Sequence, residues 1–173
     1  IMLELGIAVD GGKDSLSMAA KVIHPNGEVE TVKSPGTLVI SAYAPCPDIT
    51  KVITPDLKMP GKSKLLFIDL GEGKNRLGGS ALSQCYKQIG DESPDIDNTQ
   101  LLKDAFNAVQ SLIDDNLILS GHDRSDGGLI VTLLEMAFAG NCGLEIEFDS
   151  PLVLEKSLIS LLFSEELGLV IEY

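Results

Sequence analysis

The sequence predicts a layered protein of the α/β or α+β class. Segments with the two-residue period of strands alternate along the chain with segments of helical period, which is the pattern of layered folds. A hydrophobic fraction of 44% in 173 residues is large enough to fill a core. Aromatic residues make up only 5% of the chain and Trp is absent, so the core must consist mainly of Leu, Ile, Val and Ala.

Three strand-like segments are predicted in the first part of the chain. Residues 3–9 are predicted to form a short strand or buried segment. Residues 28–33 alternate apolar and polar side chains after a Pro-Asn-Gly turn, which is typical of a half-exposed strand. Residues 37–44 form a continuous apolar and β-branched run, which is typical of a strand covered on both faces.

A proline-rich stretch from Pro45 to Gly61 follows these strands. Clusters of Pro and Gly interrupt regular structure and are common between domains. We therefore predict two domains, residues 1–45 and residues 46–173.

The second domain is predicted to alternate strands and helices. Apolar or alternating runs predict strands at 64–70, 117–119, 144–148 and 167–171. Apolar residues at helical spacing predict helices at 77–89, 101–113, 129–139 and 152–163. Asp97, Asn98 or Thr99 could cap the helix at 101–113, and Gly140-Asn141 is expected to end the helix at 129–139.

The charge of the chain disfavours two classes of partner. There are 13 basic residues against 26 acidic ones, the net charge is −13, and no basic run occurs. A surface that binds nucleic acid needs clustered Lys and Arg, so nucleic acid and anionic membranes are poor partners. An acidic protein can still bind a phosphorylated metabolite when Mg²⁺ bridges carboxylates and phosphates.

The cysteines indicate the cellular compartment, and the residues at the two ends indicate whether the sequence is part of a longer polypeptide. Three distant cysteines predict no disulfide framework and fit a reducing, cytoplasmic compartment. No apolar run reaches the roughly 20 residues that span a bilayer, and no signal peptide is recognised before the first strand-like segment. Both ends lie in apolar stretches, which favours a segment excised from a longer polypeptide.

Residues 11–18, Gly-Gly-Lys-Asp-Ser-Leu-Ser-Met, are the first candidate site. Two glycines after a predicted strand allow close backbone approach, and Lys13 and Ser15 offer donors for phosphate or carboxylate oxygens. Asp14 could bind a metal or a lysine. The pattern is not a Walker loop, and a plain strand–turn–helix with a capping Asp or Ser explains it as well.

Residues 122–128, His-Asp-Arg-Ser-Asp-Gly-Gly, are the second candidate. Asp123 could ligate Mg²⁺, since hard cations take carboxylate oxygens. Ser125 and the N–H groups near Gly127 and Gly128 could meet a phosphate at the start of the next helix. Alternatively, Ser125 or Asp126 is only the N-cap of that helix. His122 is expected to be a structural hydrogen-bonding residue.

Two weaker patterns have ordinary explanations. The segment 76–80, Arg-Leu-Gly-Gly-Ser, could bind an anion, but a loose turn accounts for its glycines equally well. Glu165 and Glu166 are expected to be a solvated helix end, because adjacent carboxylates seldom face the same way. No nucleophile–base set can be assembled, so we predict no catalytic residue in this chain.

Five segments in order resemble the second synthetase-like half of phosphoribosylformylglycinamidine synthases in their long single-chain form. Nearly the whole chain is covered, and five motifs in the right order and spacing are far more specific than any one of them. The segments are Val-Asp-Gly-Gly-Lys-Asp-Ser-Leu-Ser-Met (9–18), Pro-Gly-Thr-Leu-Val-Ile-Ser-Ala-Tyr-Ala (35–44), Thr-Pro-Asp-Leu-Lys (54–58), Gly-His-Asp-Arg-Ser-Asp-Gly-Gly-Leu (121–129) and Leu-Leu-Glu-Met-Ala-Phe-Ala-Gly-Asn-Cys-Gly-Leu (133–144).

The resemblance implies a fold and an activity. Enzymes of this family convert formylglycinamide ribonucleotide, glutamine and ATP to the amidine, with release of glutamate, ADP and phosphate. Their synthetase core is similar to aminoimidazole ribonucleotide synthetase. Residues 1–45 would be the tail of an N-terminal lobe, and residues 46–173 the C-terminal lobe. The implied partners are the rest of the N-terminal lobe, the first synthetase-like half and the glutaminase domain.

The resemblance also implies site residues. By position, Asp123 matches a metal-ligating Asp of an auxiliary site for ATP or ADP with Mg²⁺, and Ser125 matches a nucleotide contact. Lys13, Asp14 and Ser15 match a motif that lines the nucleotide cleft of the wider superfamily. Because the other metal carboxylates of the family lie before Ile1, the chain alone is expected to be inactive and to bind nucleotide weakly. Alternatives are another member of the synthetase superfamily and a non-catalytic module whose nucleotide is structural.

Overall fold

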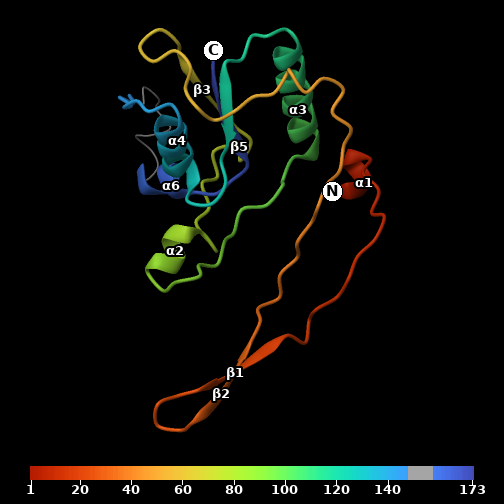
Figure 1. Cartoon of the computed structure of the whole chain (residues 1–173), viewed down its shortest axis with the longest axis vertical. Helices are drawn as coiled ribbons and strands as arrows, with labels where there is room; N and C mark the ends of the chain where they lie inside the picture. Colours follow the sequence, from red (N-terminus) through yellow and green to blue (C-terminus); the bar gives the residue numbers. More distant parts are fainter. Residues whose placement is uncertain (148–157) are drawn as a thin grey trace. The chain divides into compact units, whose positions relative to one another are not determined.

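The structure is a computed structural model that describes residues 1–147 and 158–173. The chain divides into two units: Met2–Pro47, and Asp48–Tyr173 together with Ile1. Figure 1 labels their helices and strands. Among the described residues, no helix combines the length and the hydrophobicity needed to cross a membrane.

The unit Met2–Pro47 contains one helix and one hairpin. Strand β1 (Ala19–Ile23) pairs antiparallel with β2 (Val29–Lys33), in a register that places Ala19 opposite Lys33. A turn joins them, in which Gly27 N–H donates to the carbonyl of His24 at 2.9 Å. The strand predicted at 28–33 is confirmed, whereas its partner β1 was not predicted.

The strand predicted at residues 3–9 is wrong. Met2–Leu5 form a short helix, α1, with the sequence Met-Leu-Glu-Leu. These residues are all good helix formers, and Gly6, with φ of 74°, follows the last turn. Local preference therefore decides this segment, because none of the strands in the described part of the chain pairs with it.

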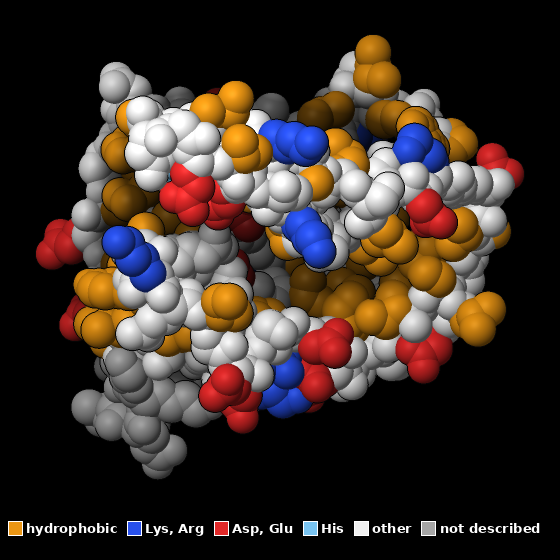
Figure 2. Space-filling model, turned by 90° about the horizontal axis from the view of Figure 1, so that it is seen from below, with side chains coloured by type: hydrophobic (Ala, Val, Ile, Leu, Met, Phe, Trp, Pro, Cys, Tyr) orange, Lys and Arg blue, Asp and Glu red, His pale blue; other side chains and the backbone are white. Residues whose placement is uncertain are grey.

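The covered strand predicted at residues 37–44 is also wrong for this chain. The segment is not a strand, and its apolar side chains are open to solvent, with Leu38 84% exposed. No residue of Met2–Pro47, all of which the structure describes, is buried. A continuous apolar run forms a covered strand only when other strands and a second layer pack against it. Figure 2 shows hydrophobic side chains lying open on the surface between charged ones.

A three-stranded antiparallel sheet forms the centre of the second unit. Its order is β3 (Leu65–Asp69), β5 (Gly168–Glu172) and β4 (Ser120–Asp123), so the last strand of the chain lies in the middle. Val170 lies opposite both Phe67 and His122. The strands predicted at 64–70 and 167–171 are confirmed.

Strand β4 lies just after the strand predicted at 117–119. Its sequence, Ser-Gly-His-Asp, lacks the branched side chains that favour strands. Its pairing with β5 continues from Leu119, whose N–H donates to the carbonyl of Glu172 at 2.9 Å. Tertiary pairing therefore sets this strand and brings Asp123 to its end.

The described helices of this unit are α2 (Ala81–Cys85), α3 (Thr99–Asp114), α4 (Gly128–Ala139) and α6 (Leu158–Phe163). Helices α3 and α4 confirm the predictions at 101–113 and 129–139, with Asn98 as the N-cap of α3 and Gly140 as the C-cap of α4. Helix α2 is shorter than the predicted 77–89, because it begins only after its N-cap Ser80.

Two predictions extend beyond the described residues. Residues 144–147 do not form the predicted strand, and Phe148 lies outside the described residues. Residues 152–157 of the predicted helix at 152–163 also lie outside them, while α6 is helical as predicted.

The core lies between α4 and the sheet. Leu129, Leu133 and Met136 of α4 form a buried cluster with Leu57 and Val170. Helix α6 contacts α4, and Figure 1 shows the two side by side. The contact is close: a Cβ added to Gly128, which has φ of 76°, would lie 2.6 Å from the backbone carbon of Phe163. Glycine is therefore required where α4 begins.

Candidate functional site

The turn between β4 and α4 is held by its own backbone. Arg124 N–H donates to the carbonyl of Gly168 at 2.8 Å, which extends the pairing between β4 and β5 by one residue. The hydroxyl of Thr132 in α4 donates to the carbonyl of Asp123 at 3.0 Å. Along this segment the side chains alternate: Asp123 and Ser125 are exposed, and Arg124 between them is buried.

The Arg124 side chain holds the turn in place through contacts with other segments of the chain. Its Nε donates to the carbonyl of Glu166 at 2.5 Å, and its Nη2 donates to the carbonyl of Leu167 and to Asp69 Oδ1, each at 2.8 Å. The guanidinium carbon lies 4.9 Å from the centre of the Phe67 ring. These contacts attach the turn to the end of β3 and to the segment that leads into β5.

The Asp123 carboxylate faces solvent. Its side chain is 74% exposed, and Oδ1 lies 3.1 Å from Nδ1 of His122. The other ring nitrogen of His122 lies 2.8 Å from Glu135 Oε2. His122 is thus a hydrogen-bonding residue between two carboxylates, as expected. A carboxylate has about four acceptor positions, so Asp123 can still bind a cation.

The N-terminus of α4 differs from the expected cap. Gly127, in the left-handed region with φ of 87°, is the N-cap, and neither Ser125 nor Asp126 caps the helix with its side chain. Gly127 N–H donates to Glu165 Oε1 at 2.8 Å, and Gly128 N–H donates to the carbonyl of Ser125 at 3.0 Å. These two N–H groups already have acceptors within the chain, so the Ser125 hydroxyl is the better donor for a phosphate here.

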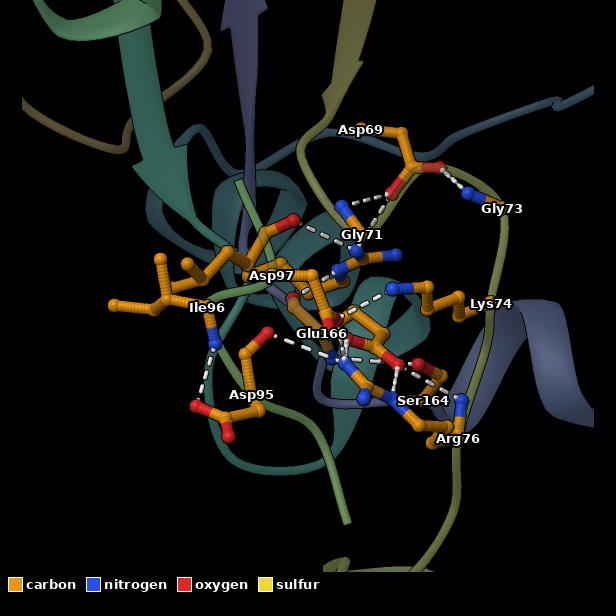
Figure 3. A network of polar contacts seen from close by, with 12 residues as sticks. Asp69, Gly71, Gly73, Lys74, Arg76, Asp95, Ile96, Asp97, Ser164 and Glu166 are labelled. Atoms are coloured by element: carbon orange, nitrogen blue, oxygen red, sulfur yellow. Dashed lines mark hydrogen bonds and ion pairs between the residues drawn. The ribbon is translucent and has the colours of Figure 1, made fainter. Parts of the chain in front are cut away.

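The expectation that Glu165 and Glu166 form a solvated helix end is wrong. Glu165 Oε1 also accepts from Ala81 N–H at 2.8 Å, so one carboxylate joins the starts of α2 and α4. Glu166 is 0% exposed. Its carboxylate accepts from Arg76 Nε at 2.6 Å and from Arg76 Nη2 at 2.9 Å, and Figure 3 shows the two side chains facing one another.

Two nitrogens of the Arg76 side chain, Nε and Nη2, take part in this network. The hydrogen bonds to Glu166 raise the pKa of Arg76, and Nη2 also lies 2.8 Å from Asp97 Oδ2. Lys74 lies 2.7 Å from the same Asp97 oxygen, and its hydrogen bond, supported by the charge of Arg76, lowers the pKa of Asp97. Arg76 is therefore occupied by internal carboxylates, which disfavours residues 76–80 as an anion site.

A polar hollow of about 540 Å³ lies beside this network. Its lining combines two cations with three carboxylates and a hydroxyl, from Lys74, Arg76, Asp91, Glu92, Ser93 and Asp95. No sequence pattern indicates the pairing of Arg76 with Glu166 beside this hollow, because the two residues are 90 positions apart.

The remaining candidates, Lys13, Asp14 and Ser15, lie together in the unit Met2–Pro47. Lys13 Nζ donates to the carbonyl of Asp14 and to the hydroxyl of Ser15, each at 2.7 Å. All three residues are exposed. The structure thus groups the candidates within each unit: these three in one, and Asp123 with Ser125 in the other.

The described residues provide part of a magnesium site. Asp123 offers one exposed carboxylate at the end of a strand. Within residues 1–147 and 158–173, no group of three or more His, Cys, Asp or Glu side chains is arranged to hold a metal ion. Mg²⁺ is commonly bound through carboxylates together with phosphates and waters, so Asp123 fits the role of one ligand of such a site and does not form a complete site by itself.

Comparison with known proteins assigns both parts of the chain. Residues 65–172 match the family model described as AIR synthase related protein, C-terminal domain. Residues 1–45 match the model described as FGAR-AT PurM_N-like domain. The first match covers the sheet β3-β5-β4 and the turn that carries Asp123 and Ser125.

Curated relatives match the chain over nearly its whole length. It is 60% identical to a probable phosphoribosylformylglycinamidine synthase, chloroplastic/mitochondrial, of Arabidopsis thaliana, over 172 residues. It is 56% identical to the phosphoribosylformylglycinamidine synthase of Homo sapiens and 55% identical to that of Dictyostelium discoideum. Each match covers 99% of this chain but only 12% to 13% of the relative, so the chain spans about an eighth of their length.

Proposed function

Because the chain belongs to the family of AIR synthase related proteins through their C-terminal domain, we propose that it is part of a purine-biosynthesis ligase. The reaction is that of phosphoribosylformylglycinamidine synthase, in which formylglycinamide ribonucleotide, glutamine and ATP give the amidine. The names of the relatives and the identities of 55% to 60% support this assignment. Other members of the synthetase superfamily are less favoured, because the relatives described above all bear the synthase name.

Within that enzyme, the turn after β4 contributes one side of a nucleotide–Mg²⁺ site. Asp123 supplies a metal ligand, and the Ser125 hydroxyl contacts the nucleotide. The observation that carries this proposal is the exposure of these two side chains on either side of the buried Arg124. When bound, Mg²⁺ supplies charge that offsets the charge of the phosphates. Lys13, Asp14 and Ser15 offer further donors and acceptors to the same kind of ligand.

The proposed partners are the remaining domains of the enzyme. Residues 1–45 belong to an N-terminal lobe and residues 46–173 to a C-terminal lobe. The rest of the N-terminal lobe, the first synthetase-like half and the glutaminase domain complete the protein. We propose a cytoplasmic location, although the name of the Arabidopsis relative includes chloroplastic/mitochondrial.

Alone, the 173-residue chain is expected to be inactive and to bind ADP–Mg²⁺ weakly or not at all. A single carboxylate cannot satisfy a cation that requires octahedral coordination and dehydrates reluctantly. Calorimetric titration of the isolated chain with ADP and Mg²⁺ tests this expectation. An affinity in the micromolar range would show that the chain carries a complete site.

Asp123→Asn in the complete protein tests the function of the turn. If the nucleotide takes part in catalysis, turnover falls at least about tenfold while thermal stability is retained, since one first-sphere ligand is lost. Asp126→Asn, an exposed neighbour on the same turn, is the matched control and should leave turnover unchanged. Normal turnover in both variants would contradict a catalytic site.

A non-catalytic module is the second candidate, favoured by the solvent-facing position of Asp123. In that case Asp123→Asn lowers the thermal unfolding temperature, and the protein that stays folded turns over normally. The same preparation of the complete protein, assayed for both quantities, separates the two candidates.

A further inference from the structure

We propose that Arg124 is a positioning residue for the nucleotide–Mg²⁺ site, whose guanidinium fixes the directions of the Asp123 and Ser125 side chains. This inference rests on the function proposed above for those two residues. Arg124 is only 4% exposed, so it does not reach a ligand itself. It lies between the two proposed contacts in the sequence, and any rotation of its backbone would redirect both.

The hydrogen bonds of Arg124 connect the turn to two different segments of the chain. Nε and Nη2 reach the carbonyls of Glu166 and Leu167, which precede β5, while Nη2 also reaches the carboxylate at the end of β3. The turn is therefore attached to both neighbouring segments of the sheet. Since the Glu166 carboxylate is itself held by Arg76, the position of the Glu166 carbonyl is fixed as well.

Stability alone does not explain an arginine at this position. Among the described residues, Arg124 Nη1 is the buried side-chain nitrogen or oxygen without a hydrogen-bond partner. A buried cation with an unsatisfied N–H group is costly, and the hydrogen bonds of Nε and Nη2 have to offset that cost. A requirement for geometry accounts for the arginine.

Lysine cannot reproduce this geometry. The guanidinium is planar, donates from separate nitrogens and lies over the Phe67 ring, 4.9 Å from its centre. An ammonium group has three donors at a single point, so it cannot reach the carbonyls of Glu166 and Leu167 and the Asp69 carboxylate in the same way. Arg124→Lys thus keeps the charge and removes the positioning.

The test is a titration of Mn²⁺ in the presence of ADP, carried out on the complete protein. Arg124→Lys should raise the apparent Kd for Mn²⁺ about tenfold or more, as loss of an outer-sphere partner does at other metal sites. Leu133→Ala is the matched control, because it removes a core side chain of α4 without touching the turn. Both variants are measured at a temperature at which circular dichroism shows them folded, and Leu133→Ala should keep the wild-type affinity.

The possible results of this experiment distinguish failure of the positioning role of Arg124 from failure of the proposed nucleotide–Mg²⁺ site. If Asp123→Asn weakens Mn²⁺ binding and Arg124→Lys does not, the positioning role is overturned and the proposed site stands. If Arg124→Lys and Leu133→Ala weaken binding equally, general loosening is the cause and the positioning role is again overturned. If Asp123→Asn has no effect, the proposed site itself fails.

A second variant is available if Arg124→Lys does not fold. Asp69→Asn removes the negative charge that faces Nη2, and its single amide oxygen can replace only one of the two carboxylate oxygens that accept from the N–H groups of Gly71 and Gly73. It should weaken Mn²⁺ binding beyond the error of the titration. Unchanged affinity in a folded Asp69→Asn variant would overturn the positioning role.

Discussion

Replacing Glu166 with Ala is expected to lower the free energy of unfolding of the chain by about 3–5 kcal/mol. The carboxylate is fully buried and accepts hydrogen bonds from the Arg76 backbone and side chain. Its removal leaves the Arg76 guanidinium with only Asp97 and the carbonyl of Asp95. Breaking one half of a buried ion pair costs more than the pair contributes, because the other half stays desolvated.

Urea-induced unfolding measured by far-ultraviolet circular dichroism provides this value, since the chain lacks Trp. Glu145→Ala is the matched control, because Glu145 is exposed, and it should change the free energy by less than about 0.5 kcal/mol. A change below about 1 kcal/mol for Glu166→Ala would mean that the pair contributes little to stability.

Glu172→Ala should destabilise the chain by about 3 kcal/mol. Its carboxylate accepts from the N–H groups of Lys58 and Met59 at 2.7 and 2.9 Å, and from the hydroxyls of Ser63 and Ser120 at 2.5 and 2.9 Å. Truncation leaves the N–H groups of Lys58 and Met59 and the fully buried Ser120 hydroxyl without this acceptor, whereas the Ser63 hydroxyl keeps the carbonyl of Met59. It also releases the segment that contains Lys58 and Met59 from the end of β5.

The contribution of Glu172 should depend on pH with a definite sign. Burial alone would raise the pKa of its carboxyl, but the four hydrogen bonds outweigh burial and lower it below the ordinary value of 4.5. A carboxyl whose pKa is lower in the folded state adds stability above its unfolded pKa, and this is lost as pH falls through the folded pKa. The stability difference between wild type and Glu172→Gln should therefore narrow as pH falls from about 5 to about 3. A constant difference would contradict this account.

Local sequence patterns were sufficient for elements whose determinants are local. Helix α3 shows apolar residues at helical spacing directly after its cap Asn98, and α4 ends at Gly140-Asn141, where Asn141 is in the left-handed region with φ of 50°. The apolar runs of β3 and β5 likewise marked strands of the sheet, of which β5 is mostly buried and β3 is only partly buried. In each case the residues that decide the structure are neighbours in the chain.

The sequence could not predict features that depend on distant partners. Strand β4 exists because β5 pairs with it. The N–H group of the N-cap residue Gly127 donates to the carboxylate of Glu165, which lies 38 positions later in the chain. The burial of Glu166 requires Arg76, which is 90 positions earlier. The apolar run at 37–44 has the composition of a covered strand but forms no strand, because a covered strand also needs a sheet around it, and β1-β2 is the only sheet of that unit.

The candidate site also combines features that the local sequence indicates with features that depend on distant partners. Asp123 and Ser125 were identified by residue type and by resemblance, and both are exposed on one turn. Nothing in the spacing indicated that Arg124 between them is buried, because its partners Asp69, Glu166 and Leu167 come from other segments. The sequence thus indicated which residues are candidates for the site, but not which contacts hold the turn that carries them.

The most direct test of the account is whether Asp123 binds the metal ion. The free Mn²⁺ signal in electron paramagnetic resonance, measured with ADP and the complete protein, gives the affinity for wild type, Asp123→Asn and Asp126→Asn. We predict that Asp123→Asn weakens Mn²⁺ binding at least about tenfold, whereas Asp126→Asn binds as wild type does. Equal affinity in all three proteins would contradict the account, because the exposed carboxylate at the end of β4 would then have no part in a nucleotide–metal site.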